Sequence, residues 1–171
     1  MLRPADTLKQ GRFELTAGAA MNTLPEVTAV AQLAVGVFDW LELGAQYETY
    51  SALGQVRFGI LSSEEHGFAL ALAVGGGAAN LVENIDEENE PWDNGAVLAG
   101  ITLGRRWDFF ELYLGYKSLL LLPLQYSINS VKAGVRFTLF EVVVLGIEGG
   151  VTFHHAFLTL GEGAAHLGFT F

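Results

Sequence analysis

The sequence predicts an all-β fold, a transmembrane antiparallel up-and-down β-barrel of about ten strands, with eight strands as the alternative. Three observations support this prediction. Apolar residues alternate with small or polar ones in segments of about ten residues, as in strands that face lipid on one side. Hydrophobic residues make up 51% of the 171 residues, and the mean hydropathy is +0.36. The longest apolar stretch, 68–82, is rich in Gly and Ala and contains Asn80, so no segment supplies the roughly 20 apolar residues of a spanning helix.

The first five predicted strands are the segments 12–21, 28–37, 41–50, 54–61 and 68–78. Each places apolar side chains at every second position. Their apolar faces are Phe13, Leu15, Ala17, Ala19, Met21; Ala29, Ala31, Leu33, Val35, Val37; Leu41, Leu43, Ala45, Tyr47; Val56, Phe58, Ile60; and Phe68, Leu70, Leu72, Val74. The third and fourth segments show the contrast clearly, because Glu42, Gln46 and Arg57 fall on the opposite face.

The other five predicted strands are 96–105, 110–117, 130–139, 142–154 and the C-terminal segment that ends at Phe171. Their apolar faces are Val97, Ala99, Ile101, Leu103; Phe110, Leu112, Leu114, Tyr116; Val131, Ala133, Val135, Phe137, Leu139; Val143, Leu145, Ile147, Val151, Phe153; and Ala165, Leu167, Phe169, Phe171. Pro4, Pro25, Pro91 and Pro123 all fall outside the ten segments, as a hydrogen-bonded ladder requires.

The connections differ between the two ends of the predicted barrel. Those at one end are short or compact, at 38–40, 62–67, 106–109 and 140–141. Several of them contain aromatic residues, which we interpret as an interfacial girdle. The predicted girdle consists of Phe38, Trp40, Trp107, Phe109 and Phe140. The opposite end is expected to hold longer loops at 80–94, 118–129 and 155–163, besides two short ones at 22–26 and 51–53.

The chain ends His166-Leu167-Gly168-Phe169-Thr170-Phe171, in mid-strand and on an aromatic residue. Soluble domains rarely end in this way, because their termini are usually frayed and polar. This ending resembles the C-terminal strand of bacterial outer-membrane β-barrel proteins, in which a terminal Phe is part of the signal that the assembly machinery reads. The resemblance implies that Phe169 and Phe171 form an assembly signal. It also implies a location in the bacterial outer membrane, with the lipid bilayer and the barrel-assembly machinery as partners.

An even number of strands places both termini and the short turns in the periplasm. We therefore predict one barrel domain over residues 1–171, with residues 1–10 as a periplasmic N-terminal lead-in. The start, Met1-Leu2-Arg3-Pro4, has no apolar signal region. A secreted protein is then expected to be represented here by its mature form and an initiator Met.

A soluble β-sandwich or lipocalin-like barrel also alternates, and it is the alternative to a membrane barrel. In a soluble fold, the face opposite the apolar one must be a well-solvated surface. That face is instead rich in glycine and carries few charges; its glycines include Gly18, Gly36, Gly44, Gly59, Gly75, Gly100, Gly104, Gly115, Gly134, Gly146, Gly150 and Gly168. Glycines suit a curved, crowded lumen better than a solvated face.

The polar face of the predicted strands has balanced charges, five acidic and five basic, although the chain carries a net charge of −10. Buried charges must be paired, so we predict a salt-bridged lumen. The predicted lumen network consists of Arg12, Glu14, Glu42, Glu48, Arg57, Glu111, Tyr113, Lys117, Lys132, Arg136 and Glu148. A barrel of about ten strands is close to the size that side chains can fill. The wall from Ala69 to Gly75 and from Gly100 to Gly104 is lined by small residues, and we expect long side chains such as Tyr113 or Arg136 to fill that space.

These observations favour a largely plugged barrel that acts as a structural or interaction component of the cell envelope, with a possible envelope protein as partner. A narrow passive pore for small solutes or cations is the alternative, because the small-residue wall leaves a water path if it is not filled. Nucleic acid is not an expected partner, since the pI is about 4.7 and the chain has nine basic residues.

One predicted loop is strongly acidic, and its oxygen ligands suit a hard cation such as Ca²⁺. The possible cation loop contains Glu83, Asp86, Glu88, Glu90 and Asp93. No D-x-[DN]-x-[DN]-G run is present, so we interpret the loop as a solvated acidic segment and predict no metal and no cofactor. The chain has no cysteine, which excludes disulfides and thiolate metal sites.

Outer-membrane barrels include ten-stranded proteases and smaller lipid A deacylases, so a hydrolase is a third possibility. His154 and His155 are expected near the outer rim, where Asp86 and Asp93 could approach them. The chain has no pair of rim aspartates at a strand end and no His-x-Ser after Phe153. The sequence therefore predicts that the protein is not an enzyme and names no catalytic residue.

Overall fold

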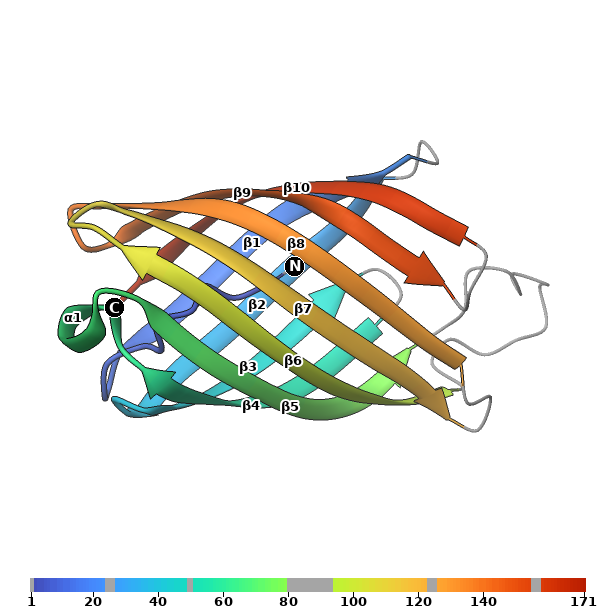
Figure 1. Cartoon of the computed structure of the whole chain (residues 1–171), viewed down its shortest axis with the longest axis horizontal. Coiled ribbons are helices and arrows are strands. Elements are labelled where there is room, and N and C mark those ends of the chain that lie inside the picture. Colours follow the sequence, from blue (N-terminus) through green and yellow to red (C-terminus); the bar gives the residue numbers. More distant parts are fainter. Residues whose placement is uncertain (1, 24–26, 49–50, 80–93, 123–125, 155–157) are drawn as a thin grey trace.

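Ten antiparallel strands form a closed barrel in the computed structural model, which describes residues 2–23, 27–48, 51–79, 94–122, 126–154 and 158–171 (Figure 1). The strands are β1 (Phe13–Asn22), β2 (Val27–Phe38), β3 (Leu41–Glu48), β4 (Ser51–Leu61), β5 (Ala69–Ala79), β6 (Asn94–Arg106), β7 (Phe110–Leu122), β8 (Tyr126–Leu139), β9 (Val143–His154) and β10 (Leu158–Thr170). One short helix, α1 (Ser63–His66), lies between β4 and β5. The prediction of a ten-stranded up-and-down barrel is confirmed.

Every strand pairs with its neighbours in the sequence, and β1 pairs with β10 to close the barrel. At this seam Glu14 lies opposite Thr170. The backbone N–H of Phe13 donates to the carbonyl oxygen of Phe171 at 2.9 Å, and the N–H of Phe171 donates back to Phe13 at 2.8 Å. The chain terminus is therefore hydrogen-bonded into the ladder, and closure leaves β1 and β10 without an exposed edge.

Apolar side chains cover the outside of the barrel, and polar side chains point inward. In β6, Val97, Ile101 and Leu103 are exposed, whereas Leu98 and Thr102 on the other face are buried. Charged side chains are among the most buried of the whole structure, since Glu42 and Arg57 are 0% and 2% exposed. This is the reverse of a soluble fold and excludes the sandwich and lipocalin alternatives. An apolar outer wall with every strand paired is the arrangement of a transmembrane barrel.

The connections at 39–40, 62–68, 107–109 and 140–142 all lie at one end, which we call the short-turn end. The opposite end, where β5 ends and β6 begins, is called the loop end. In the described part of the chain, no helix has the length and hydropathy needed to cross a membrane.

Several strands extend further toward the loop end than the sequence predicts. β4 begins at Ser51, so the predicted short loop 51–53 is paired strand. β7 continues to Leu122 and β8 begins at Tyr126, so most of the predicted loop 118–129 is paired strand. β10 likewise begins at Leu158, inside the predicted loop 155–163. In the run Leu119–Leu122 both faces are apolar, because Leu119 and Leu121 point into the barrel. Inward and outward positions then carry the same residue type, so the alternation that identifies a strand cannot be detected in such a run.

Candidate functional site

The N-terminal segment, residues 2–10, folds back into the barrel. Residues 9–12 form a tight turn in which the Arg12 N–H donates to the Lys9 carbonyl oxygen at 3.0 Å. Gly11 takes a φ of +77° in this turn, a conformation that side chains disfavour. This segment, dark blue in Figure 1, enters the barrel from the short-turn end beside β1. The sequence predicts residues 1–10 as a periplasmic N-terminal lead-in, whereas in the structure the side chains of Leu2, Arg3, Ala5 and Leu8 are buried inside the barrel.

The inserted segment is well packed. Leu2, Arg3, Ala5 and Leu8 are each at most 9% exposed. Inward-facing glycines of four strands leave the space for it: Gly36, Gly59, Gly104 and Gly115. A Cβ atom on Gly115 would lie 2.8 Å from the Leu2 side chain, and one on Gly36 would overlap with the backbone oxygens of Leu8 and Lys9. These glycines therefore leave the space in the lumen that the N-terminal segment occupies.

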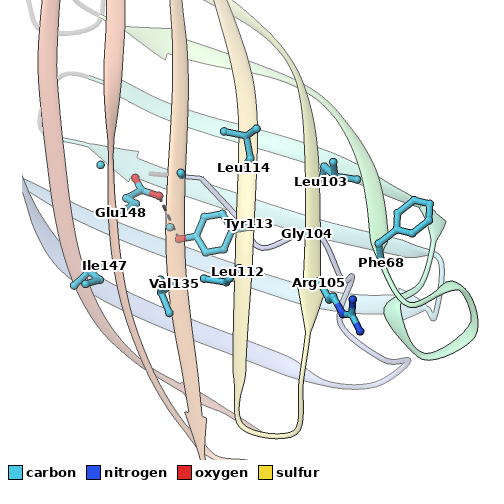
Figure 2. Close-up of a pocket in the computed structure, with 13 residues that line it drawn as sticks. Phe68, Leu103, Gly104, Arg105, Leu112, Tyr113, Leu114, Val135, Ile147 and Glu148 are labelled. Atoms are coloured by element: carbon cyan, nitrogen blue, oxygen red, sulfur yellow. Dashed lines mark hydrogen bonds between the residues drawn. The ribbon is translucent and has the colours of Figure 1, made fainter.

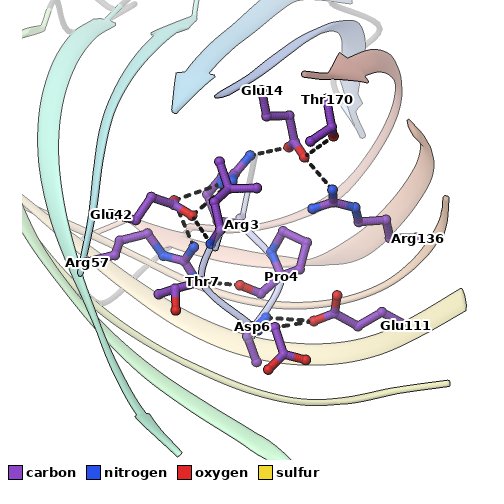
Figure 3. A network of polar contacts seen from close by, with 12 residues as sticks. Arg3, Pro4, Asp6, Thr7, Glu14, Glu42, Arg57, Glu111, Arg136 and Thr170 are labelled. Atoms are coloured by element: carbon purple, nitrogen blue, oxygen red, sulfur yellow. Dashed lines mark hydrogen bonds and ion pairs between the residues drawn. The ribbon is translucent and has the colours of Figure 1, made fainter. Parts of the chain in front are cut away.

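Arg3 lies at the centre of the polar contacts in the short-turn half of the lumen (Figure 3). Its guanidinium binds Glu42 through two nitrogens, Nε at 3.2 Å and Nη2 at 3.1 Å, and also pairs with Glu14. Each carboxylate has a second arginine from the barrel wall. Arg57 pairs with Glu42 at 3.0 Å, and Arg136 pairs with Glu14. Arg3 therefore joins two barrel-wall ion pairs into one network.

Backbone groups of the segment satisfy further buried carboxylates. Glu111 accepts hydrogen bonds from the backbone N–H groups of Ala5 at 2.9 Å and Asp6 at 3.4 Å. Glu148 accepts one from the Leu2 N–H at 3.0 Å. Arg57 donates in return to the carbonyl oxygen of Pro4. An unpaired carboxylate buried in this position would cost several kcal/mol. These backbone contacts therefore help to hold the segment in place, in addition to the ion pairs of Arg3.

We call Arg3, Arg57, Arg136, Glu14, Glu42 and Glu111 the charge centre. Glu111 and Arg136 belong to it because they lie opposite each other in β7 and β8. Within these six residues three arginines balance three glutamates, and Arg3 is the arginine that contacts two of the glutamates, Glu14 and Glu42. Thr170, from the last strand, donates to Glu14 at 3.1 Å.

A second group of ion pairs lies nearer the loop end. Lys117 of β7 reaches across the lumen to Glu48 of β3 at 3.6 Å. Lys132 pairs with Glu162 at 2.5 Å and with Glu148 at 3.9 Å. The Lys117–Glu48 and Lys132–Glu162 pairs connect strands that are not neighbours in the sheet, so these side chains cross the lumen.

The structure places ten of the eleven predicted network residues in the lumen and contradicts one. Arg12 lies outside, at the short-turn end, where it approaches the exposed Glu141 at 3.7 Å. It precedes β1, so strand alternation does not orient its side chain. Sequence reasoning missed Arg3 and Glu162. The wall of small residues indicated that something else must fill the lumen. No motif or periodicity within residues 2–10 identifies them as the segment that fills it.

Tyr113 does not fill the small-residue wall as predicted. Its ring lies against Gly134, its cross-strand partner in β8, and its hydroxyl lies 3.5 Å from Glu148. The N-terminal segment takes the space instead, as the approach of Ala5 to Gly104 shows, since a Cβ atom on Gly104 would lie 2.9 Å from Ala5.

Apolar side chains line the lumen near the loop end on the side of β4 to β8. Leu53, Leu98, Leu119 and Leu121 are buried there in one cluster with Ala79 and Ala96, and Tyr126 and Ile128 pack against it. Between this cluster and Arg3 lies an internal cavity of about 20 Å³, lined by Leu2, Gln46 and Lys117 among others. That volume holds about one water molecule.

The predicted girdle residues all lie exposed at the short-turn end. Phe38 stacks on Trp40 with ring centroids 5.6 Å apart, and Trp107 stacks on Phe110 at 4.6 Å. Phe140 is 93% exposed and has a φ of +53° in the turn between β8 and β9. A left-handed conformation costs a non-glycine residue about 1–2 kcal/mol, so this turn holds a large aromatic residue outward at a local cost.

Exposed ion pairs at the short-turn end contribute little. Lys9 lies 2.8 Å from Glu64, and both side chains are mostly exposed. Hydrogen bonding to the Lys9 ammonium, together with its charge, lowers the pKa of Glu64. Solvent screens such pairs, which are typically worth less than about 1 kcal/mol.

The proposed cation loop, Glu83, Asp86, Glu88, Glu90 and Asp93, lies outside the described residues, as does His155 of the hydrolase alternative. Within the described residues, no group of three or more His, Asp or Glu side chains is arranged to hold a metal ion.

No family model matches the sequence, and no curated protein matches it. Solved structures with a similar fold include the de novo designed TMB2.3, with 14% identity, a TM-score of 0.44 and 94% of each chain covered. Ail, the attachment invasion locus protein of Yersinia pestis, is 12% identical with a TM-score of 0.43, over 95% of this chain and 99% of Ail. OmpTdeltaL8, a loop L8 deletion mutant of an outer membrane protein of Vibrio cholerae, is 11% identical with a TM-score of 0.42, over 94% of this chain and 98% of that one.

Proposed function

We propose that the chain is a closed β-barrel of the bacterial outer membrane that serves as a structural or interaction component of the cell envelope and does not conduct solutes. The observation that supports it best is the inserted N-terminal segment. Arg3 and the backbone of residues 2–8 occupy the lumen where a pore would need water, and they satisfy four buried carboxylates there.

The outer wall supports the membrane location. Exposed large hydrophobic side chains occur on every strand, and the aromatic residues Phe38, Trp40, Trp107, Phe109 and Phe140 gather at one end. Aromatic girdles of this kind mark the level of the membrane interface. The segment from Leu2 enters the barrel from the short-turn end and Phe171 lies at that end, so in the proposed orientation the short-turn end faces the periplasm.

Conductance tests the closed lumen directly. The full chain in planar bilayers is expected to give no stable unitary current. Gly36→Val is expected to conduct, because its side chain would overlap with the Lys9 and Leu8 backbone and displace the segment without changing a charge. Gly54→Val is the control, since that glycine faces outward and a Cβ atom on it would lie 3.9 Å from the nearest atom. Stable currents from the unmodified chain would instead support the pore alternative.

We also propose that Phe171 is part of an assembly signal. Phe171 is 65% exposed, and its ring lies 6.5 Å from those of Phe13 and Phe169. Phe171→Ala is expected to lower the amount of folded barrel in the membranes of expressing cells several-fold while leaving the yield of refolding into detergent unchanged. Phe137→Ala, an outward aromatic in β8, is the matched control and should affect neither. Equal losses in cells and in detergent would show that Phe171 acts only in packing.

The proposal includes no enzymatic activity and no cofactor. Incubation of the folded barrel with casein and with lipid A, followed by product analysis, tests this part. If the folded, unmodified chain cleaves either substrate and a variant with His154 replaced does not, the result would support a rim hydrolase.

A further inference from the structure

The outer wall has a large apolar hollow over β6 to β9, which we call the outer groove. Its volume is about 860 Å³. Outward side chains of four strands surround it: Leu103, Leu112, Leu114, Val135 and Ile147 (Figure 2). The hollow exists because Ala133 and Gly149, which lie opposite each other in β8 and β9, have almost no side chain. Its volume lies within the roughly 300–1,000 Å³ typical of ligand sites.

Arg105 lies at the edge of the outer groove, next to the short-turn end. It continues the outward row of Ile101 and Leu103 in β6 and lies opposite Leu112 of β7. Among the outward positions of the ten strands as the structure describes them, Arg105 is the one charged residue. Its guanidinium carbon lies 5.0 Å from the centre of the Trp107 ring, and within the described chain no carboxylate pairs with it.

The position of this arginine fits an anionic headgroup. An arginine on the lipid face costs about 2–4 kcal/mol at the bilayer midplane but about 0–1 near the interface. Trp107 and Phe109 follow Arg105 closely, which places Arg105 at the level of the headgroups. By contrast, two other exposed bases have carboxylate partners: Lys9 pairs with Glu64, and Arg12 approaches Glu141. Arg105 therefore offers an uncompensated guanidinium beside an apolar groove.

We propose that the outer groove binds one anionic phospholipid of the short-turn leaflet, with an acyl chain in the groove and its phosphate on Arg105. The planar guanidinium matches a phosphate in charge and geometry. The small residues Ala133 and Gly149 provide the depth for the chain. This site rests on the proposed membrane location but not on whether the lumen is closed, so lipid retention and conductance test separate claims.

Native mass spectrometry of the full chain tests the site. The protein is reconstituted in vesicles of equal phosphatidylglycerol and phosphatidylethanolamine, released in mild detergent, and its retained lipids are counted. The unmodified chain is expected to retain one phosphatidylglycerol. Arg105→Gln should lower the preference for phosphatidylglycerol about fivefold, equivalent to roughly 1 kcal/mol for one base at an anionic surface. Gly149→Leu should abolish retention of either lipid by filling the groove.

Two matched variants control for general effects. Arg106→Gln removes the neighbouring exposed arginine, and Ala19→Leu enlarges an outward residue of β1 away from the groove. Both should retain lipid like the unmodified chain. Gly149→Leu should fold, because a Cβ atom there lies 3.6 Å from the nearest atom, an ordinary contact, and gel mobility of the folded barrel checks this. The proposal is overturned by unchanged preference in Arg105→Gln, by equal loss in the controls, or by a second copy or detergent in place of the lipid.

Discussion

Replacing Arg3 with methionine is expected to lower the free energy of unfolding by about 3–5 kcal/mol, the cost of removing one partner from a buried ion pair. Methionine keeps much of the length and apolar stem of the side chain but removes the charge. Glu14 and Glu42 then keep one arginine each, Arg136 and Arg57, and lose the charge that bridges them, so one negative charge among the six residues of the charge centre is uncompensated. Urea unfolding in detergent micelles, followed by tryptophan fluorescence, measures the loss.

Two further variants separate this explanation from a general effect of removing an arginine. Arg12→Met removes an exposed guanidinium that lies 3.7 Å from Glu141, and it should change stability by less than about 0.5 kcal/mol. Glu14→Gln added to Arg3→Met restores the charge balance and should recover more than about 1 kcal/mol of the loss. If Arg3→Met and Arg12→Met cost the same, the charge centre does not stabilise the barrel.

The strands could be predicted from the sequence because two different surroundings act on alternate residues. Lipid selects apolar side chains outside, and a narrow lumen selects small or paired polar side chains inside. This rule placed Glu42 and Arg57 on the inward face, where the structure shows their side chains meeting at 3.0 Å. It failed where both sides are apolar, as at Leu119 and Leu121, which are buried in the cluster at the loop end.

The N-terminal segment could not be predicted by the same rule, because it belongs to no strand. Its contacts are long-range: Arg3 reaches Glu42, and the Leu2 N–H reaches Glu148, 146 residues away. No periodicity links such positions. The sequence did contain an indirect signal, a lumen wall of alanine and glycine too small to fill its own space. In the structure, residues 2–8 fill the space that this wall leaves empty.

Gly134→Ala is expected to destabilise the barrel by about 1–3 kcal/mol, the usual cost of overpacking. Its Cβ atom would overlap with the ζ carbon and hydroxyl oxygen of Tyr113, whose side chain is buried and lies directly across the strand pair. The ring cannot move freely, since its hydroxyl lies 3.5 Å from Glu148. Unfolding in urea again provides the measurement, and Gly149→Ala, at an outward position in β9, is the control with little expected effect.

A double-mutant cycle assigns the loss to the tyrosine ring rather than to the strand backbone. Tyr113→Ala alone should cost about 3–5 kcal/mol, as for other large aromatic truncations. In Tyr113→Ala background the Gly134→Ala change should cost nearly nothing, because the atoms that it would overlap are gone, giving a coupling of about 1–3 kcal/mol. If the two costs simply add, then Gly134 is required by the curvature of β8. If they couple, glycine is required there by one aromatic ring, as Gly36 is required by the inserted segment, and the lumen glycines are then sites of contact rather than of flexibility.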